Sequence, residues 1–232
     1  MRLSMSEPTA LTDRVLFIDG EAIVLDKPAG LAVHPGPSTR DSLEDHLADL
    51  RFGFQRAPSP VHRLDRDTSG CLLLARHPKA LKRFAAEFEA GRVTKTYLAV
   101  LDGVPEGEEG LIDLALAKVS SREQGWRMVP SARGKPSLTR WRVVGEADGR
   151  ALVRFDPKTG RTHQLRVHAA EGLGVPILGD PIYGRGTGQG GGEGTMLHAA
   201  ALRLERGPKP PVEAKAPLPA PFAALGFADA EL

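Results

Sequence analysis

Residues 61–76 read VHRLDRDTSGCLLLAR, and this stretch predicts how the rest of the chain is arranged. Its first part carries His, Arg, Asp, Thr and Ser side chains and ends at Gly70, a composition typical of a shaped polar loop. Residues 71–75 that follow are an apolar run of strand length. Because catalytic and binding groups are often placed on loops that a rigid strand holds, we expect the functional centre here.

The composition is that of a globular protein. A chain of 232 residues can form one large domain or two small lobes, and 41% hydrophobic with 26% charged residues excludes a disordered chain. The single cysteine, Cys71, excludes an internal disulfide, and in an apolar run it is expected to be a small buried side chain rather than a nucleophile. No stretch approaches the ~20 apolar residues of a membrane span, and we find no signal peptide, so we expect a cytoplasmic protein.

Positive charge is concentrated in one part of the chain. Residues 118–142 carry seven Lys or Arg side chains against one Glu, although the net charge of the whole chain is only +2. A basic stretch of this kind indicates a local contact with a polyanion. A solvated charged face explains the pattern equally well, and the residues alone do not separate the two interpretations.

Periodicity and breakers predict the helices. Residues 42–51 have apolar side chains on one helical face, with Asp41 and Glu44 at the spacing of a capping box. Residues 78–90 are the clearest helix, because Pro78 suits its first turn and a glycine follows its end. Residues 161–171 fit a helix better than a strand, with the strand kept as the alternative.

The expected strands come from short apolar runs between turns. We expect a hairpin over 15–26 and further strands at 93–101, 111–117, 138–144, 150–155 and 195–205. Residues 178–184 are expected to form a rigid turn and residues 186–194 a mobile glycine-rich loop. From residue 208 the chain is rich in proline, and we expect an extended or partly disordered tail.

Asp65 is the side chain in the central loop with the clearest chemistry. It is flanked by Arg63 and Arg66, and a carboxylate beside guanidinium groups stays ionised at neutral pH. An ionised, held carboxylate can serve as a nucleophile or as a base. Asp67 could be a second acid, but an Asp before Thr-Ser-Gly is typical of a turn that bonds its own backbone. The histidines have no metal-binding spacing, so we predict no metal site.

Five motifs in order resemble one known family. HRLDRDTSG (62–70) resembles the signature of the RluA family of RNA pseudouridine synthases. The other four motifs, found on both sides of it, are VLDKPAGLAVHPG (24–36), KTYLAVL (95–101), GRTHQLRVHAA with LGDPIYG (160–170 and 178–184) and LHAAAL (197–202). The matches extend from about residue 15 to residue 205, nearly the whole chain.

The resemblance implies a fold and a reaction. The fold would be the α+β pseudouridine synthase fold, bilobed, with a largely antiparallel central sheet, flanking helices and a central RNA cleft. The reaction would convert specific uridines of structured ribosomal or transfer RNA to pseudouridine, without cofactor or metal. A catalytically silent RNA-binding protein of the same fold is the alternative.

The resemblance also implies roles for individual residues. Asp65 would be the nucleophile, Tyr97 would stack on the target uracil, and Arg166 would pair with Asp65. The substrate-binding residues that the motifs suggest are Arg63, Leu165, Leu197, His163 and Arg161. Without the resemblance, ordinary roles would be favoured for four of them: Tyr97 as a strand aromatic, Arg166 as a surface helix residue, and Leu165 and Leu197 as core.

The chain is expected to be a stand-alone catalytic domain. We assign an N-terminal extension to residues 1–14, the catalytic domain to 15–207 and the tail to 208–232. Many relatives carry an S4 RNA-binding domain before the first strand, and the short extension predicts that it is absent. We expect a monomer, because no heptad pattern is present.

Overall fold

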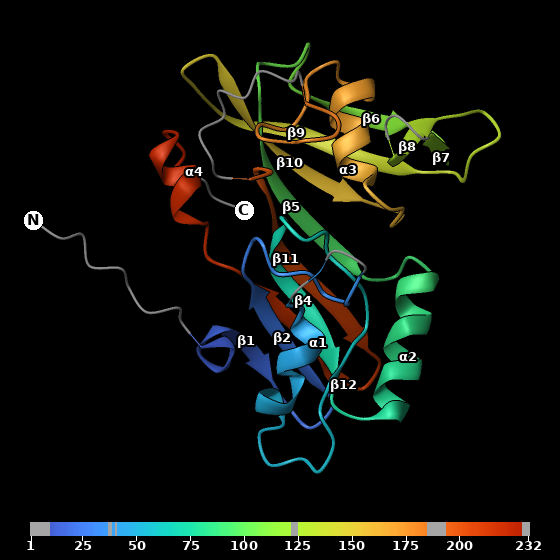
Figure 1. The fold of residues 1–232 in the computed structure, drawn as a ribbon, viewed down its shortest axis with the longest axis vertical. Coiled ribbons are helices and arrows are strands. Elements are labelled where there is room, and N and C mark those ends of the chain that lie inside the picture. The colour runs from blue at the N-terminus through green and yellow to red at the C-terminus, as the bar shows by residue number, and fades with distance from the viewer. Residues whose placement is uncertain (1–9, 37–38, 40, 122–124, 185–193, 229–232) are drawn as a thin grey trace, which may run out of the picture.

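The computed structural model describes residues 10–36, 39, 41–121, 125–184 and 194–228. These residues form an α+β fold on one ten-stranded sheet (Figure 1). The strands follow the order β1-β2-β4-β11-β5-β10-β9-β6, with β12 beside β11 and β3 beside β4. Among the described pairs only β4 and β11 are parallel, so the predicted largely antiparallel sheet is confirmed.

The strands of the sheet are β1 (Val15–Ile18), β2 (Ala22–Lys27), β3 (Ser59–Pro60), β4 (Ser69–Ala75), β5 (Thr94–Leu101), β6 (Glu109–Asp113), β9 (Leu138–Ala147), β10 (Arg150–Pro157), β11 (Leu197–Arg206) and β12 (Lys209–Lys215). A separate two-stranded sheet consists of β7 (Leu116–Ser121) and β8 (Gly125–Pro130). The helices are α1 (Leu43–His46), α2 (Pro78–Glu89), α3 (Gln164–Val167) and α4 (Ala220–Ala224), with 3₁₀ turns η1 (Leu11–Arg14) and η2 (Leu47–Leu50) and a π turn η3 (His168–Gly172).

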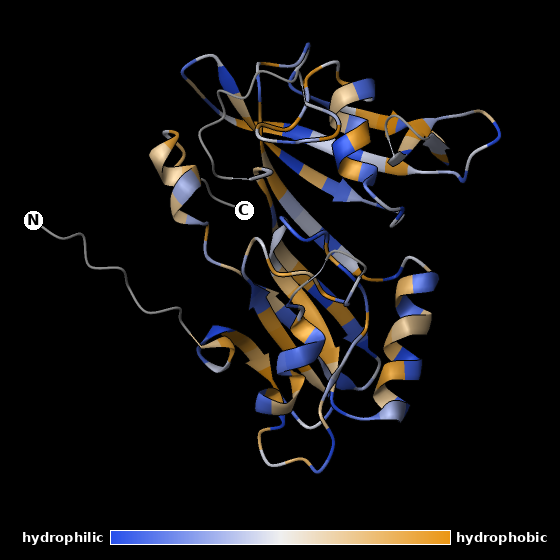
Figure 2. Ribbon diagram, in the orientation of Figure 1, coloured by the Kyte–Doolittle hydropathy of each residue, from blue (hydrophilic) through white to orange (hydrophobic). Residues whose placement is uncertain are grey.

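β4 is buried on both faces because successive side chains point to opposite sides of the sheet. Cys71 and Leu73 face one hydrophobic cluster, which contains Phe84 of α2. Leu72 and Leu74 face another, which contains Leu43 of α1. Figure 2 shows the strands of this part of the sheet coloured largely hydrophobic, between α1 and α2. A continuous apolar run is what a strand covered on both faces requires, and the predicted burial of the cysteine is confirmed.

The sheet passes through two halves of the molecule (Figure 1). The lower half contains β1, β2, β4, β12, α1 and α2, and its two hydrophobic clusters lie on opposite faces of the sheet. The upper half contains β6, β9, β10 and α3 around a third cluster. Because β5 and β11 lie between the halves, the predicted bilobed arrangement is confirmed.

Several predicted elements are confirmed. The hairpin over 15–26 forms β1 and β2, and Asp19 caps its turn by accepting the N–H groups of Glu21 and Ala22 at 2.8 Å each. α2 begins at Pro78, as expected. The preference for helix over 161–171 is also confirmed, although α3 covers only one turn before it becomes a π turn.

The helix predicted over 42–51 is shorter and has a different cap. α1 is a single turn that continues as the 3₁₀ turn η2. The capping box is formed by Ser42 and Asp45, so the assignment to Asp41 and Glu44 is wrong. Both carboxylates contact histidines instead, His46 at 2.7 Å from Asp41 and His34 at 2.7 Å from Glu44.

The strand predicted over 111–117 is wrong in extent. β6 ends at Asp113, and the chain leaves the main sheet before β7 begins at Leu116. Leu116 then pairs with Pro130 of β8, inside the basic stretch, where no strand was expected. The apolar pattern is continuous across the break, and it therefore does not reveal the change of sheet.

Of the extended and the partly disordered chain expected from residue 208, the extended alternative is confirmed over 209–215, and disorder is wrong for the described residues 208–228. Residues 209–215 form β12, which pairs with β11 and buries Val212 and Ala214. Residues 220–224 form α4, whose Phe222 packs into the cluster of the upper half. Two prolines fit in β12 because this strand pairs on one side only among the described strands.

The mobile loop expected at 186–194 lies outside the described residues except for Gly194. In the part of the chain that the structure describes, no helix has both the length and the apolar character needed to cross a bilayer.

Candidate active site

The central stretch 62–70 forms the loop between β3 and β4, and its last two residues are the first two of β4. Its turn is closed by a hydrogen bond from the Thr68 N–H to the Asp65 carbonyl at 3.1 Å. The Arg66 carbonyl accepts two further bonds, from the Gly30 N–H at 3.0 Å and from Lys27 Nζ at 2.9 Å. The loop that carries the carboxylate is therefore fixed to the end of β2 through its backbone.

Lys27 holds this junction from a fully buried position. Its side chain has 0% exposure, and Nζ donates to the carbonyls of Pro28 and Leu31 as well as to Arg66. Burial lowers the pKa of Lys27 to about 7, although the charges of Asp67 and Asp65 act in the opposite direction. Three carbonyl acceptors compensate the loss of water around the amine.

A cavity of about 140 Å³ opens beside this loop. Four separate parts of the chain surround it: the loop after β3, the start of β5, the segment between β10 and α3, and the start of β11. The lining residues are Arg63, Leu64, Asp65, Thr68, Lys95, Tyr97, Pro157, Thr159, Gly160, Arg161, Thr162, His163, Gln164, Leu165, Arg166 and Leu197. All eight site residues expected from the sequence are among them.

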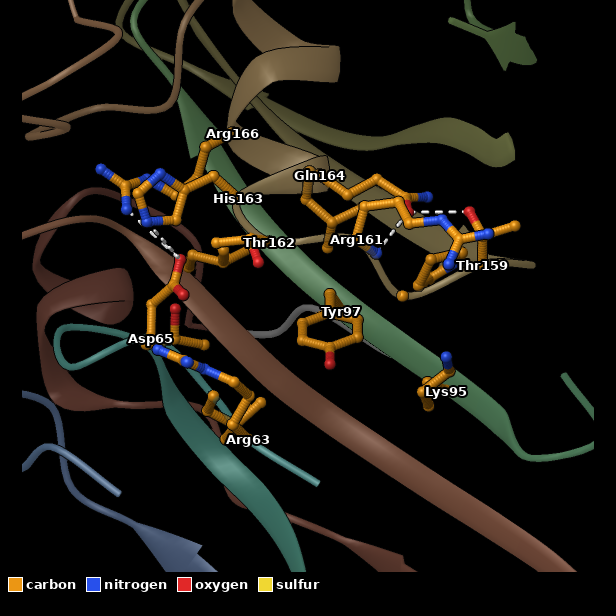
Figure 3. Close-up of a pocket in the computed structure, with 16 residues that line it drawn as sticks. Arg63, Asp65, Lys95, Tyr97, Thr159, Arg161, Thr162, His163, Gln164 and Arg166 are labelled. Atoms are coloured by element: carbon orange, nitrogen blue, oxygen red, sulfur yellow. Dashed lines mark hydrogen bonds and ion pairs between the residues drawn. The ribbon is translucent and has the colours of Figure 1, made fainter. Parts of the chain in front are cut away.

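Asp65 is placed opposite Arg166, one residue from each half of the molecule (Figure 3). Arg166 Nη1 lies 3.3 Å from Asp65 Oδ2. The other side of the guanidinium is bound by Asp180, with Nε 2.7 Å and Nη2 2.8 Å from the two carboxylate oxygens. The bidentate pair fixes the plane of the guanidinium, so one N–H remains directed at Asp65.

Asp180 is buried and fully bonded. Its side chain has 0% exposure, and it also accepts the N–H groups of Ile182 and Tyr183 at 2.8 and 3.0 Å. Burial alone would raise the pKa of Asp180, but the hydrogen bonds from Arg166 and the two N–H groups lower it below its usual value. Burial of Arg166 lowers its pKa, but the hydrogen bonds and charge of Asp180 outweigh this effect, so the pKa of Arg166 is raised.

His163 is the second group that faces Asp65. Its Nε2 lies 3.8 Å from Asp65 Oδ2, and burial lowers its pKa, with Asp65 acting in the opposite direction. The hydroxyl of Tyr183 lies 2.9 Å from Nδ1 and accepts the Met128 N–H at 2.9 Å. This geometry favours donation from Tyr183 to Nδ1, which leaves the proton of the neutral ring on Nε2, facing Asp65.

Two further contacts hold the histidine. Its ring stacks on Trp126 with centroids 4.9 Å apart, so the β7–β8 sheet touches the site. His163 has φ +52°, in the left-handed region that non-glycine residues seldom occupy. Such strain persists only where surrounding contacts enforce it, and here the ring contacts and the start of α3 do so.

The segment before α3 is organised by Gln164, whose side chain is buried. Its Oε1 accepts bonds from the Thr159 hydroxyl at 2.7 Å and the Arg161 N–H at 2.9 Å (Figure 3). Its Nε2 donates to Thr139 Oγ1 at 2.9 Å and to the Leu138 carbonyl at 3.2 Å. This network fixes the position of Arg161, whose Nε in turn donates to the Pro136 carbonyl at 3.1 Å.

Tyr97 lies on β5, where Figure 3 shows its ring in the middle of the cavity. Burial, and to a lesser extent the charge of Asp65, raises the pKa of its hydroxyl, so the ring is neutral at physiological pH. Leu165 and Leu197 supply apolar walls. A flat ring with apolar walls beside a held carboxylate can receive a planar base and present its sugar to the carboxylate.

Asp180, Lys27, Tyr183 and Lys95 lie in or behind the site, and sequence reasoning assigned them no role. Asp180 and Tyr183 belong to the stretch expected to be a rigid turn, and Lys27 to a shaped loop. One signal was available, because all four lie inside the motifs quoted for the family resemblance. A buried Lys and a buried Asp cannot be told from surface ones without knowing what covers them.

Comparison with known proteins establishes the family. The model described as RNA pseudouridylate synthase matches residues 21–171, which contain the central loop, β5 and α3. The chain belongs to this family. The RNA pseudouridylate synthase match covers more than half of the chain, and the resemblance to the RluA family expected from the sequence is confirmed.

The relatives of this RNA pseudouridylate synthase chain include bacterial and human proteins. It is 56% identical to an uncharacterised RNA pseudouridine synthase of Zymomonas mobilis, over 94% of this chain and 99% of the relative. It is 36% identical to ribosomal large subunit pseudouridine synthase D of the same organism, over 79% of this chain and 60% of the relative. The chain thus spans less than two thirds of that synthase.

A solved structure shows the same fold. Human RNA pseudouridylate synthase domain containing 4 superposes with a TM-score of 0.79 at 27% identity, over 96% of this chain and 95% of the human chain. The expected pseudouridine synthase fold is therefore confirmed.

Proposed function

We propose that this chain converts uridine in RNA to pseudouridine, with Asp65 as the nucleophile. The observation that carries the proposal is the position of Asp65, held 3.3 Å from Arg166 at a cavity in which Tyr97 presents its ring. In the reaction, the bond from N1 of uracil to C1′ of the sugar breaks. The base turns, a bond from C5 to C1′ forms, and the C5 proton leaves while N1 gains one.

The site residues divide this work. Asp65 supplies the electron pair for the displacement, and Arg166 holds its carboxylate in place. Tyr97 supports the base by stacking while it is detached from the sugar, between the apolar side chains of Leu165 and Leu197. A base inside an RNA helix cannot reach a cavity of this kind, so the target uridine must leave its stack.

The basic side chains at the rim would bind the RNA around the target. Arg63 and Arg161 line the cavity, and His163 faces Asp65. Arg133 and Lys135, from the basic stretch, are exposed in the segment between β8 and β9. Phosphate contacts of this kind fix the register of the RNA without reading its sequence.

Ribosomal RNA is the substrate class we favour. Synthases D and C of the ribosomal large subunit are relatives at 36% and 39% identity. Transfer RNA remains the alternative. We further expect a cytoplasmic monomer, and light scattering coupled to size-exclusion chromatography tests the oligomeric state.

Tritium release tests the reaction. Total RNA labelled at C5 of uridine, from a strain that lacks the gene, is incubated with wild type, Asp65→Asn and Asp67→Asn. We expect release by wild type, a loss of more than about 10³-fold in Asp65→Asn, and near wild-type release by Asp67→Asn, because Asp67 forms an ion pair with exposed Arg66 at 3.5 Å and is absent from the lining of the cavity. Separating ribosomal from transfer RNA then identifies the substrate.

Two results would contradict the proposal. Equal release by wild type and Asp65→Asn would remove Asp65 as the nucleophile. No release from any RNA pool, with RNA binding retained, would favour an RNA-binding protein without catalytic activity.

A further inference from the structure

A second hollow lies directly beside the active-site cavity. Its volume is about 500 Å³, and it extends from Tyr97 towards the end of α2. The two hollows share six lining residues, so they form one continuous depression: Arg63, Lys95, Tyr97, Thr159, Gly160 and Arg161. The uracil site proposed above occupies only the smaller one.

Lys95 lies where the two hollows meet. It is two residues from Tyr97 on β5, so both side chains leave the same face of the strand, with Cα atoms about 6.6 Å apart. Figure 3 shows Tyr97 between Asp65 and Lys95 along the strand. A nucleic-acid strand whose base stacks on Tyr97 therefore passes Lys95 with its adjoining backbone.

The amine of Lys95 has no anionic partner among the described residues. Its Nζ lies 5.9 Å from the centroid of the Phe88 ring. Burial lowers its pKa, and no carboxylate acts against this effect. Nearby cations differ in this respect, since Arg154 lies 3.0 Å from Asp156 and Arg92 lies 2.6 Å from Glu87. A half-buried cation without a counter-ion is costly unless a ligand supplies one.

The walls of the second hollow are also positively charged. Arg63, Lys158 and Arg161 line it with Lys95, and Glu89 is the one acidic side chain in the lining. No ion pair of Lys158 or Arg63 is found within the described ranges. The floor is completed by the stacked rings of His62 and Phe88, whose centroids are 4.4 Å apart. Four cationic side chains and one exposed carboxylate, that of Glu89, give the hollow a positive charge that suits a phosphate group.

We propose that this hollow is a subsite for an RNA phosphodiester group next to the target uridine, with Lys95 as its central contact. The assignment rests on the proposed function, because it places the target base on Tyr97. Lys95 binds a phosphate oxygen that lies between the two hollows, while Lys158 and Arg161 contact the strand further along. The ammonium group thus acts in substrate binding and takes no part in bond breaking.

Salt-dependent RNA binding tests the subsite without requiring turnover. Lys95→Met keeps the length of the side chain and removes its charge, whereas Lys95→Arg keeps a charge. Lys79→Met is the matched control, because Lys79 is an exposed lysine at the start of α2, far along the helix from the hollow. The probe is a transcript of large-subunit ribosomal RNA, with affinity measured from 50 to 300 mM salt.

The expected result is the loss of one phosphate contact. The slope of log affinity against log salt is negative, and Lys95→Met should make it less steep by about 0.7, while Lys95→Arg and Lys79→Met keep the wild-type slope. Lys158→Ala should also make the slope less steep. Because Lys158 is exposed, this second variant carries little risk to folding. In tritium release, Lys95→Met should raise KM at least threefold and leave kcat within twofold.

Other outcomes separate the two proposals. An unchanged slope in both Lys95→Met and Lys158→Ala would overturn the subsite. So would a fall in kcat at unchanged KM, because it would make Lys95 a support for Tyr97. If the slope is less steep in Lys95→Met and Lys158→Ala but wild type releases no tritium, the proposed reaction is contradicted and the anion subsite remains supported.

Discussion

At the scale of single residues, the site depends on a buried ion pair of which Arg166 lines the cavity and Asp180 lies behind it. Asp180 neutralises Arg166 and fixes the direction of its guanidinium, and Arg166 in turn contacts Asp65. Removing one partner of a buried ion pair leaves an uncompensated charge, whereas a pair exposed to water contributes little. Asp180 is therefore a positioning residue for the nucleophile.

Asp180→Asn should lower the free energy of unfolding by about 3–5 kcal/mol, measured by urea denaturation at pH 7. Glu109→Gln is the control, because Glu109 and Arg142 form an exposed pair at 3.3 Å, and its cost should stay below about 1 kcal/mol. Because the pKa of Asp180 is lowered in the folded state, wild type should lose this stability as the pH falls below 3.8, and the variant should not. Equal stability of the two variants at pH 7 would contradict the assignment.

Lys27 should make the free energy of unfolding depend on pH in the neutral to alkaline range. Its pKa falls from 10.5 to about 7 on folding, so between these values the unfolded chain binds more protons than the folded one. Stability then rises with pH across this window, since deprotonation removes the cost of a buried charge.

We expect the stability of wild type, relative to Lys27→Met, to increase between pH 7 and pH 9.5 in urea denaturation. Lys79→Met should show no such change, because Lys79 is exposed. A difference between wild type and Lys27→Met that is constant with pH would show that Lys27 is not charged differently in the two states.

At the scale of elements, the contact between β4 and β11 depends on a residue without a side chain. Gly70 has φ +101°, and a Cβ there would lie 2.3 Å from the Ala199 carbonyl oxygen. Gly70, the second residue of β4, thus sets how closely the parallel strand β11 can approach.

Gly70→Ala should cost about 3 kcal/mol or more in unfolding free energy, from backbone strain and a clash with main-chain atoms together. Gly207→Ala is the matched control, because Gly207 has φ +64° with nothing within 4 Å, and backbone strain alone should cost about 1–2 kcal/mol. Thermal and urea denaturation of both variants measure the difference. Similar costs would mean that the strands separate easily.

The elements also show what a sequence can and cannot predict. α2 and β4 follow from local pattern, because one helical stripe or one apolar run meets a large core. The change of sheet between β6 and β7 and the pairing of β12 do not, because they depend on which distant strand is free to pair. The proline content of residues 208–232 indicates disorder only if no edge is available, and β11 provides one.

The residues of the active site also divide into those that the sequence predicts and those that only the folded structure reveals. The residues that face the cavity, such as Asp65 and Tyr97, lie in stretches recognisable from the sequence, and the structure brings them together. The residues behind them act through burial. Asp180 and Lys27 have ordinary neighbours along the chain, and only the folded arrangement places them at 0% side-chain or residue exposure.

At the scale of the whole molecule, residues 209–227 link both halves. β12 buries Val212 in the lower half, and the segment after it buries Phe222 and Phe227 in the upper half. A chain that ends at residue 207 should therefore show no cooperative thermal transition and no tritium release. A stable, active protein of residues 1–207 would contradict this link.

The position of β11 also determines when the molecule can fold during synthesis. The chain first delivers β1, β2 and β4 to the ribosomal exit, and later β5, β6, β9 and β10, but β11 lies between β4 and β5. Without β11, the edges of β4 and β5 that pair with it in the folded chain have no partner strand, and unpaired strand edges favour misassociation. We therefore expect β11 to be the strand that joins the two halves during folding, and the chain to be most prone to misassociation before β11 is available.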